Sequence, residues 1–232
     1  MLLNADGQAS MATAIMMSHH GFRRDIALIA SALNRLVAGD GTASAALREE
    51  ACAALREDWK GFHAKLHGHH EAEDHGMFPN LKQQHPEVGS VIDGLTSDHR
   101  RMDPLLERGE RAYAELPTKE AAVSIAAELS ALLDPHLATE EAHLIPFLRK
   151  AKAFPPPAND GEAAMYAEGF AWSSFGIAPE VLERVDETLS DALKSRLPAA
   201  RAAFAETFRR RWGNGAAGTS RTSIPDWLPG GG

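Results

Sequence analysis

Residues 67–79 read HGHHEAEDHGMFP and contain four of the chain's eleven histidines together with three carboxylates. Packing alone does not require this density of imidazole. His69 and Glu73 are four residues apart, so on a helix they project from the same face, one turn apart. The same pair recurs at His136 and Glu140. Imidazole and carboxylate side by side form half of a metal site, so two such halves predict a two-metal site inside a helical bundle.

The composition favours one helical domain, alone or with an appendage. Ala, Leu and Glu are frequent among the 232 residues, whereas Tyr occurs only twice; this usage favours helix over strand. The net charge of -8 argues against a nucleic-acid partner, and the single cysteine, Cys52, excludes an internal disulfide and a cysteine-based metal site. Without a long apolar run or a secretory signal, we expect a cytoplasmic protein and no membrane partner.

Four segments carry apolar residues at alternating spacings of three and four, which is typical of bundle helices. We expect these helices over about residues 11–37, 44–75, 86–116 and 118–150, with a kink or a local break at Pro104 and a local distortion near His136 caused by Pro135 and Pro146. On each stripe one histidine replaces an apolar residue, and two stripes also carry a glutamate: His19, His69 with Glu73, His99, and His136 with Glu140. A lone buried histidine is more often a core residue, but a buried glutamate is costly unless it is paired or bound to metal.

The four stripe histidines can lie at one level of an up-down-up-down four-helix bundle. Their distances from the connecting loops differ by about 3 Å or less for two neighbouring pairs and by about 9 Å for His19 and His69. His20 falls off the stripe. His70, like His63 and His67, lies on a neighbouring face, where it is either a group flanking the site or a solvated histidine; of the three, His70 is the candidate for an additional ligand or a support of the ligands.

Six converging ligands are too many for one tetrahedral zinc ion. Two six-coordinate ions could share them, with the two glutamates as bridges and an oxo or hydroxo bridge between the ions. This arrangement leaves positions open for a small exogenous ligand. Histidine and carboxylate without thiolate suit iron, manganese or zinc, and an open two-metal site suits two iron ions and dioxygen-type chemistry.

Four motifs resemble the hemerythrin-like, or HHE cation-binding, domain in its bacterial form: HHGFRRD at 19–25, HHEAED at 69–74 with Phe78-Pro79, Asp98-His99, and HLATEE at 136–141. The resemblance covers about residues 12–150 and implies a four-helix bundle with a non-haem di-iron centre that binds oxygen or related small molecules. Carried over by position, it implies these metal ligands: His19, His69, Glu73, His99, His136 and Glu140.

The sequence departs from this family at one position. Oxygen-carrying hemerythrins have a second histidine one turn after the ligand on the third helix, and Asp103 stands there in this chain. Asp103 is either an additional ligand or a sign that one iron is more open. Reversible oxygen carriage is therefore not implied.

The C-terminal third is expected to be a separate extension. Pro155–Pro157 predict a linker, and residues 158–212 carry short apolar stripes at Val181–Leu193 and Phe204–Trp212. These stripes are too short to form a core alone, so we expect them to pack on the bundle or to form a homodimer interface. Residues 213–232 are expected to be a flexible tail.

Three functions remain open at this point. The first is a di-iron protein that binds or processes dioxygen, peroxide or nitric oxide. The second is an iron or oxygen sensor that signals through its C-terminal extension, and the third is a structural metal-binding bundle without small-ligand chemistry. The sequence contains no recognisable nucleophile arrangement or Gly-rich phosphate loop, so no catalytic residue is assigned and enzymatic activity stays undecided.

Overall fold

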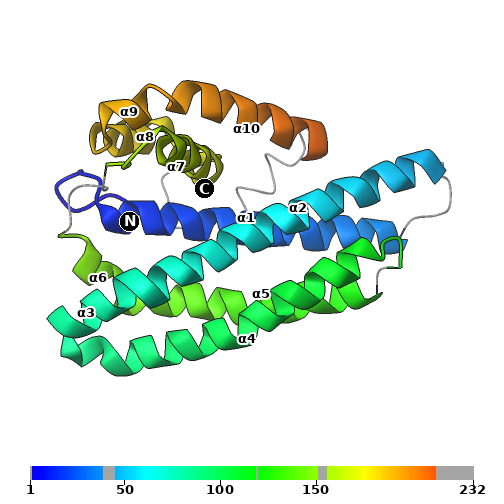
Figure 1. The fold of residues 1–232 in the computed structure, drawn as a ribbon, viewed down its shortest axis with the longest axis horizontal. Coiled ribbons are helices and arrows are strands. Elements are labelled where there is room, and N and C mark those ends of the chain that lie inside the picture. Colours follow the sequence, from blue (N-terminus) through cyan, green and yellow to red (C-terminus); the bar gives the residue numbers. More distant parts are fainter. Residues whose placement is uncertain (1, 39–44, 119, 151–155, 213–232) are drawn as a thin grey trace. The chain divides into compact units, whose positions relative to one another are not determined.

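The computed structural model describes residues 2–38, 45–118, 120–150 and 156–212 (Figure 1). Packing divides the chain into two units, one formed by Met1–Arg24 with Ile145–Gly232 and the other by Asp25–Leu144. Helix α1 (Met11–Ala38) contributes to both units. None of the described helices is long and apolar enough to cross a membrane.

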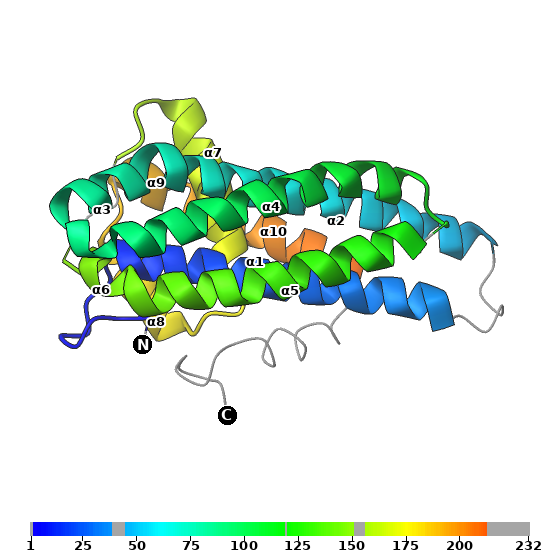
Figure 2. The same cartoon turned by 90° about the horizontal axis from the view of Figure 1, so that it is seen from below.

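The unit formed by Asp25–Leu144 is a bundle of long antiparallel helices. It contains the second half of α1 together with α2 (Ala45–Ala72), α4 (Gly89–Ala114) and α5 (Glu120–His143). Helix α4 packs against both α2 and α5, and α4 and α5 run side by side in Figure 2. The predicted fold class, an all-α bundle of antiparallel helices followed by C-terminal helices, is confirmed.

Helices α2 and α4 approach each other closely at Gly109. Trp59 is fully buried and stacks on Tyr113 with ring centroids 4.4 Å apart. A Cβ atom at Gly109 would lie 1.9 Å from Cζ2 of Trp59. The indole ring therefore occupies the space that any side chain at position 109 would need.

Helices α4 and α5 continue through Pro104 and Pro135, so the break that was one alternative at Pro104 does not occur. A kink at Pro104 and a distortion near His136 stay predictions. A proline inside a helix removes the hydrogen bond to the carbonyl four residues earlier. Both prolines are exposed, and so are the residues with these carbonyls, Arg100 and Ala131. Water can therefore hydrogen-bond the freed carbonyls, and the helices need not break.

Helix α2 passes directly into a π-helical turn, η1 (Glu73–Met77), which leads into α3 (Phe78–Gln84). The backbone N–H of Phe78 donates to the carbonyl of Glu73, five residues earlier. The wider turn holds one residue more than an α-helical turn, so the residues after it are rotated relative to α2. As a result Phe78 is buried, while Met77 is only partly buried.

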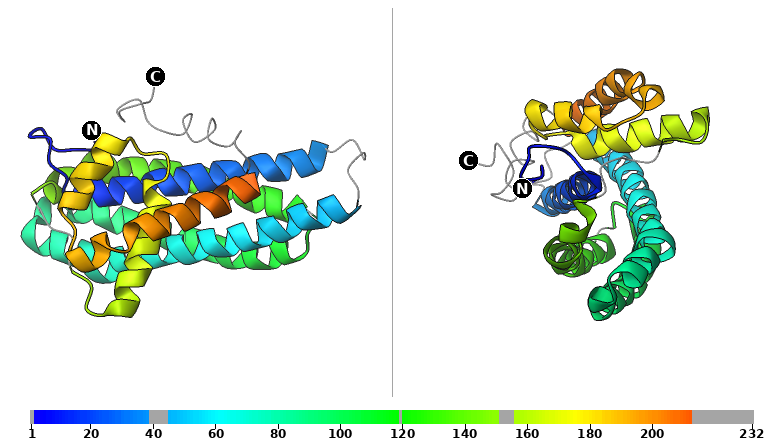
Figure 3. Two further views of the ribbon diagram at one scale, coloured as in Figure 1. Left: turned by 90° about the horizontal axis from the view of Figure 1, so that it is seen from above. Right: turned by 90° about the vertical axis from the view of Figure 1, so that its left-hand side faces the viewer.

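The other unit joins the N-terminal part of α1 to the C-terminal helices. These are α6 (Ile145–Leu148), α7 (Asp160–Ser174), α8 (Pro179–Glu187), α9 (Asp191–Lys194) and α10 (Leu197–Trp212), of which α7 and α10 pack together (Figure 3). The predicted stripe from Val181 to Leu193 is buried in this unit's core. The predicted tail, 213–232, and part of the predicted linker lie outside the described residues. The division into domains at 12–150 and 158–212 stays a prediction.

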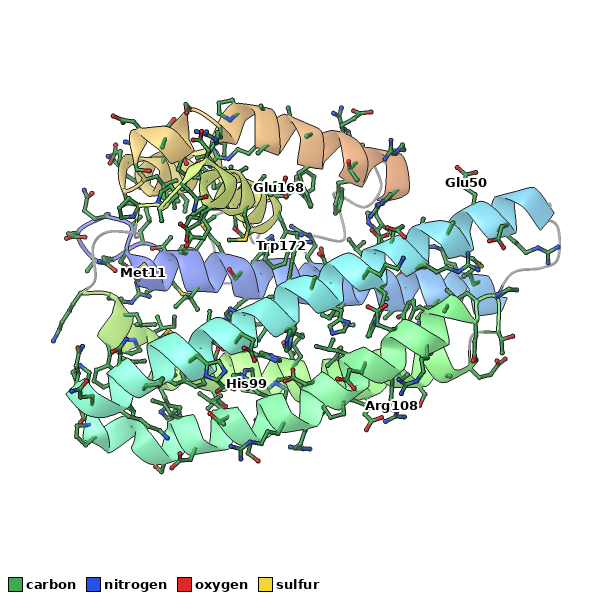
Figure 4. All side chains as sticks on the ribbon, in the orientation of Figure 1. Met11, Glu50, His99, Arg108, Glu168 and Trp172 are labelled. Carbon is green, nitrogen blue, oxygen red and sulfur yellow. The ribbon has the colours of Figure 1, made fainter. Side chains whose placement is uncertain are left out.

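Within this unit, α1 and α7 meet at Gly21 and Trp172. A Cβ atom at Gly21 would lie 2.6 Å from Cζ2 of Trp172, so the indole ring rests directly on the helix backbone (Figure 4). Phe22 supports the same indole at a centroid distance of 4.9 Å. The absence of a side chain at residue 21 therefore allows α7 to approach α1 here.

Arg24, one turn further along α1, is buried to 1 % exposure by the same C-terminal helices. Its Nη1 donates to the carbonyl oxygens of Trp172 and Phe175, at 2.9 and 3.2 Å. Its guanidinium carbon lies 5.5–5.9 Å from the centroids of four aromatic rings: Trp172, Phe175, Phe204 and Phe208. Cation–π attraction and the two carbonyls stabilise the buried charge and hold α7 and α10 at α1.

Candidate metal centre

Four of the predicted ligands form one buried cluster inside the Asp25–Leu144 unit. The potential ligand atoms of Glu73, His99, His136 and Glu140 all lie within 4.8 Å of one another. Nε2 of His99 is 3.2 Å from Nε2 of His136 and 3.5 Å from Oε2 of Glu73. All four residues are 3 % exposed or less. Figure 4 labels His99 on α4, and the three other residues come from η1 and α5.

A fifth predicted ligand, His69, is next to this cluster. Its Nε2 lies 3.0 Å from Oε1 of Glu73, one helical turn away, as the spacing predicted. The sixth, His19, is fully buried on α1 and belongs to the other unit. Its assignment as a ligand stays a prediction.

The carboxylates of this cluster need a cation or a proton. Neither oxygen of Glu73 accepts a hydrogen bond of good geometry from the described residues. Burial, followed by repulsion from Glu140, raises the pKa of Glu73 well above its ordinary value. Two neighbouring buried carboxylates cannot both be ionised without a compensating positive charge, which a metal ion would supply.

The histidines are suited to metal binding as well. Burial lowers the pKa of His136 to about 4, so its imidazole is neutral at pH 7 and does not need to lose a proton before it binds a metal ion. Imidazole nitrogens and carboxylate oxygens without sulfur form a donor set that suits iron, manganese or zinc. The cluster is therefore consistent with a metal site.

Asp74 orients one of these histidines and was not predicted as a site residue. Its Oδ2 lies 3.0 Å from Nδ1 of His99, and its Oδ1 accepts a hydrogen bond of 2.9 Å from Thr96. The ring of Phe78 stacks on His99 at 5.6 Å. A carboxylate on the outer nitrogen of a histidine is a common support for metal ligands, because it fixes the tautomer and turns the other nitrogen inward.

The structure separates the three histidines that the sequence placed on a neighbouring face of α2. His63 is partly buried and pairs with Glu110 at 2.8 Å, and the side chain of His67 is 50 % exposed. His70, in contrast, is 2 % exposed, and its Nδ1 lies 2.9 Å from Oδ1 of Asp103. His70 is thus not a solvated residue.

His20, the neighbour of His19, has a different environment. It is buried, and its Nε2 lies 3.0 Å from the carbonyl oxygen of Phe175, within the unit that contains the C-terminal helices. This contact gives His20 a structural role in holding the C-terminal residues. The position of His20 off the apolar stripe gives no indication of this contact.

Comparison with known proteins supports a metal-binding role. A family model described as the hemerythrin HHE cation binding domain matches residues 10–155, which is more than half of the chain. No curated protein matches the chain, and no solved structure does either. The matched range contains every residue of the buried cluster.

Proposed function

Because the chain belongs to the hemerythrin HHE cation-binding domain family, we propose that it is a non-haem di-iron protein that binds or processes dioxygen, peroxide or nitric oxide. One observation carries the proposal: two imidazoles and two carboxylates, all buried, lie within 4.8 Å of one another. Two carboxylates at this spacing can bridge a pair of ions. We also propose the cytoplasmic location that the sequence predicts.

The proposed ligands come from all four long helices and the π-helical turn: His19, His69, Glu73, His99, His136 and Glu140. When bound, the two iron ions would supply redox chemistry and an open position for a small ligand. The chain holds imidazole nitrogens inward, through supports such as Asp74 on His99. It also excludes bulk water, because the clustered side chains are almost completely buried.

The first test is the metal content of protein purified without added metal. We expect about two iron atoms per chain and near-ultraviolet charge-transfer absorption from a bridging oxygen, because the proposed ligand set can hold two ions. Elemental analysis and an optical spectrum measure both quantities. Protein that contains one tightly bound zinc ion and no iron would instead support the structural metal bundle.

A second test distinguishes the adjacent histidines of α1. His19→Ala is expected to lose most of the bound metal, since His19 occupies the same stripe position as the other histidine ligands. His20→Ala is its matched control and is expected to retain the metal, because its ring nitrogen is engaged with the carbonyl of Phe175. Metal analysis after dialysis against a chelator gives the answer. Equal losses in both variants would contradict the assignment of His19.

One observation favours the sensor as a second candidate function. His20, Gly21 and Arg24 follow the proposed ligand His19 directly along α1, and all three contact residues of the C-terminal segment in their own unit. A shift of α1 on metal loss would therefore disturb the packing of α7 and α10. We propose that such a shift would expose the C-terminal helices to a partner.

The sensor function predicts that metal loss increases proteolysis within residues 160–212. Gly21→Ala should increase this cleavage even in the metal-loaded protein, because its Cβ would overlap the ring of Trp172. Gly169→Ala, on α7, is the control, since a Cβ there meets nothing within 4 Å. Limited proteolysis with mass spectrometry locates the cuts. Identical cleavage of metal-free and metal-loaded wild-type protein would eliminate the sensor function.

A further inference from the structure

We infer that His70 is an additional metal ligand, which Asp103 holds in place, on the side of the centre formed by His99 and His136. This inference rests on the proposed metal-binding function and adds a residue to it. The ring nitrogens that His70, His99 and His136 offer all lie within 4.8 Å of one another. Two nitrogens bound to one ion at about 2.1 Å are at most about 4.2 Å apart, so the spacing is close to that of a shared ion.

The inner nitrogen of His70 has no other role in the described residues. The side chain is 2 % exposed, and Nε2 is buried without a hydrogen-bond partner there. The outer nitrogen, Nδ1, faces the carboxylate of Asp103 and carries the ring proton there, so Nε2 presents its lone pair to the interior. A buried polar atom without a partner is costly unless something outside the chain satisfies it.

His70 and His99 are held in the same way. Nδ1 of His99 faces Asp74 of η1, and Nδ1 of His70 faces Asp103 of α4. Thus η1, which continues α2, supplies a carboxylate to a histidine of α4, and α4 supplies a carboxylate to a histidine of α2. In both histidines Nε2 is directed inward. The two rings stack at a centroid distance of 4.0 Å and an angle of 14°. Since His99 is a proposed ligand, the matched geometry assigns the same role to His70.

Asp103 is a positioning residue and not itself a ligand. Its side chain lies beside the outer nitrogen of His70, at 2.9 Å, on the side of the ring away from the clustered ligand atoms. Its Oδ1 is committed to the outer nitrogen of His70. A carboxylate in this position fixes the tautomer of the histidine and increases its basicity as a ligand.

A third histidine on the His99 and His136 side makes the two metal positions unequal. The ion bound there would have one coordination position fewer for an exogenous molecule than it would with two histidines. The small ligand would therefore bind at the other ion, on the side of His69. His70 in this way determines where the site is open.

The test uses the full chain loaded with cobalt(II), which gives strongly shifted proton NMR signals for the exchangeable N–H groups of bound imidazoles. His70→Ala is expected to lose one such signal relative to the wild type and to release one ion at least about tenfold faster to a chelator. Asp103→Ala leaves the imidazole of His70 in place and should weaken binding of one ion by about 10- to 100-fold.

His67→Ala is the matched control. His67 lies on the same helix, and its Nδ1 is 3.9 Å from Asp103, but its side chain is half exposed. It should keep the wild-type number of signals and the wild-type release rate. The inference is overturned if His70→Ala shows the same number of shifted signals and the same release rate as the wild type. If that variant does not fold, an unchanged metal affinity of Asp103→Ala overturns the inference instead. Wild-type protein that binds only one cobalt ion contradicts the two-metal function, while the signal count still decides whether His70 is a ligand.

Discussion

Metal-free protein is expected to melt on the order of 20 °C below the metal-loaded protein. A ligand present at a thousandfold excess over its dissociation constant stabilises the folded state by about 4 kcal/mol, and the proposed centre binds two ions. Without metal, Glu73 and Glu140 face each other in a buried cluster with the imidazoles of His99 and His136. Binding free energy is then partly folding free energy. Calorimetry before and after treatment with a chelator measures the difference.

Substitutions at Glu73 identify the source of this effect. Glu73→Ala should melt close to the metal-free wild type whether or not metal is added, whereas Glu71→Ala, at an exposed neighbouring position, should behave as the wild type. Glu73→Gln removes the buried charge without changing the shape of the side chain. In the absence of metal it should be at least as stable as the wild type at neutral pH.

The pH dependence of the metal-free protein provides a further check on Glu73. The pKa of this group is raised in the folded state, so the native protein binds more protons than the unfolded chain above about pH 4.5. The contribution of Glu73 to stability is therefore complete below that pH and is lost as the pH rises through the folded-state pKa. Glu73→Gln should lack this part of the pH dependence. Coincident melting curves for metal-free and metal-loaded wild type would contradict the coupling of metal binding to folding.

Gly109→Ala is expected to destabilise the Asp25–Leu144 unit by about 3 kcal/mol or more. The added Cβ would lie 1.9 Å from Cζ2 of Trp59 and 2.6 Å from its Nε1. The indole cannot move away easily, because it is fully buried and stacked on Tyr113. Relief of the overlap requires α2 and α4 to separate. Denaturant unfolding of the metal-loaded protein measures the loss.

Gly94→Ala is the matched control for Gly109→Ala, since both glycines lie on α4. A Cβ at Gly94 meets nothing within 4 Å. Replacing a helical glycine by alanine at such a site stabilises by up to about 1 kcal/mol, so the two substitutions should have opposite signs. The same sign in both variants would show that α2 and α4 do not pack as closely as the structure indicates.

The helices and most of the buried cluster could be predicted from sequence because polar residues interrupt an otherwise regular apolar stripe. The periodic positions His99 and His136, and the glutamates four residues after a histidine, are buried together, as that pattern predicted. Predicting buried positions from the spacing of apolar residues assumes an ideal α-helix with one narrow buried face. The elements that depart from this assumption were the ones that could not be predicted.

The π-helical turn accounts for one of these failures. No residue in 73–77 indicates that this turn contains one residue more than an α-helical turn. An ideal α-helix through this segment therefore assigns Asp74 and Phe78 to the wrong faces. The role of His70 was left open, because adjacent helical positions differ by about 100° and a stripe accepts only one of them. At Pro104 a continuous helix is possible because the affected carbonyl, that of Arg100, is on an exposed residue.

The division of α1 between two packing units has a consequence for biosynthesis. Residues up to Arg24 leave the ribosome before the side chains that enclose Arg24, because those side chains belong to residues 172–208. About 150 residues separate Arg24 from residue 172, and at about 5–20 residues per second their synthesis takes about 7–30 s. During this interval the first helical turns of α1 lack the residues that enclose Arg24. A nascent chain that stalls before residue 172 would present these turns to chaperones and proteases.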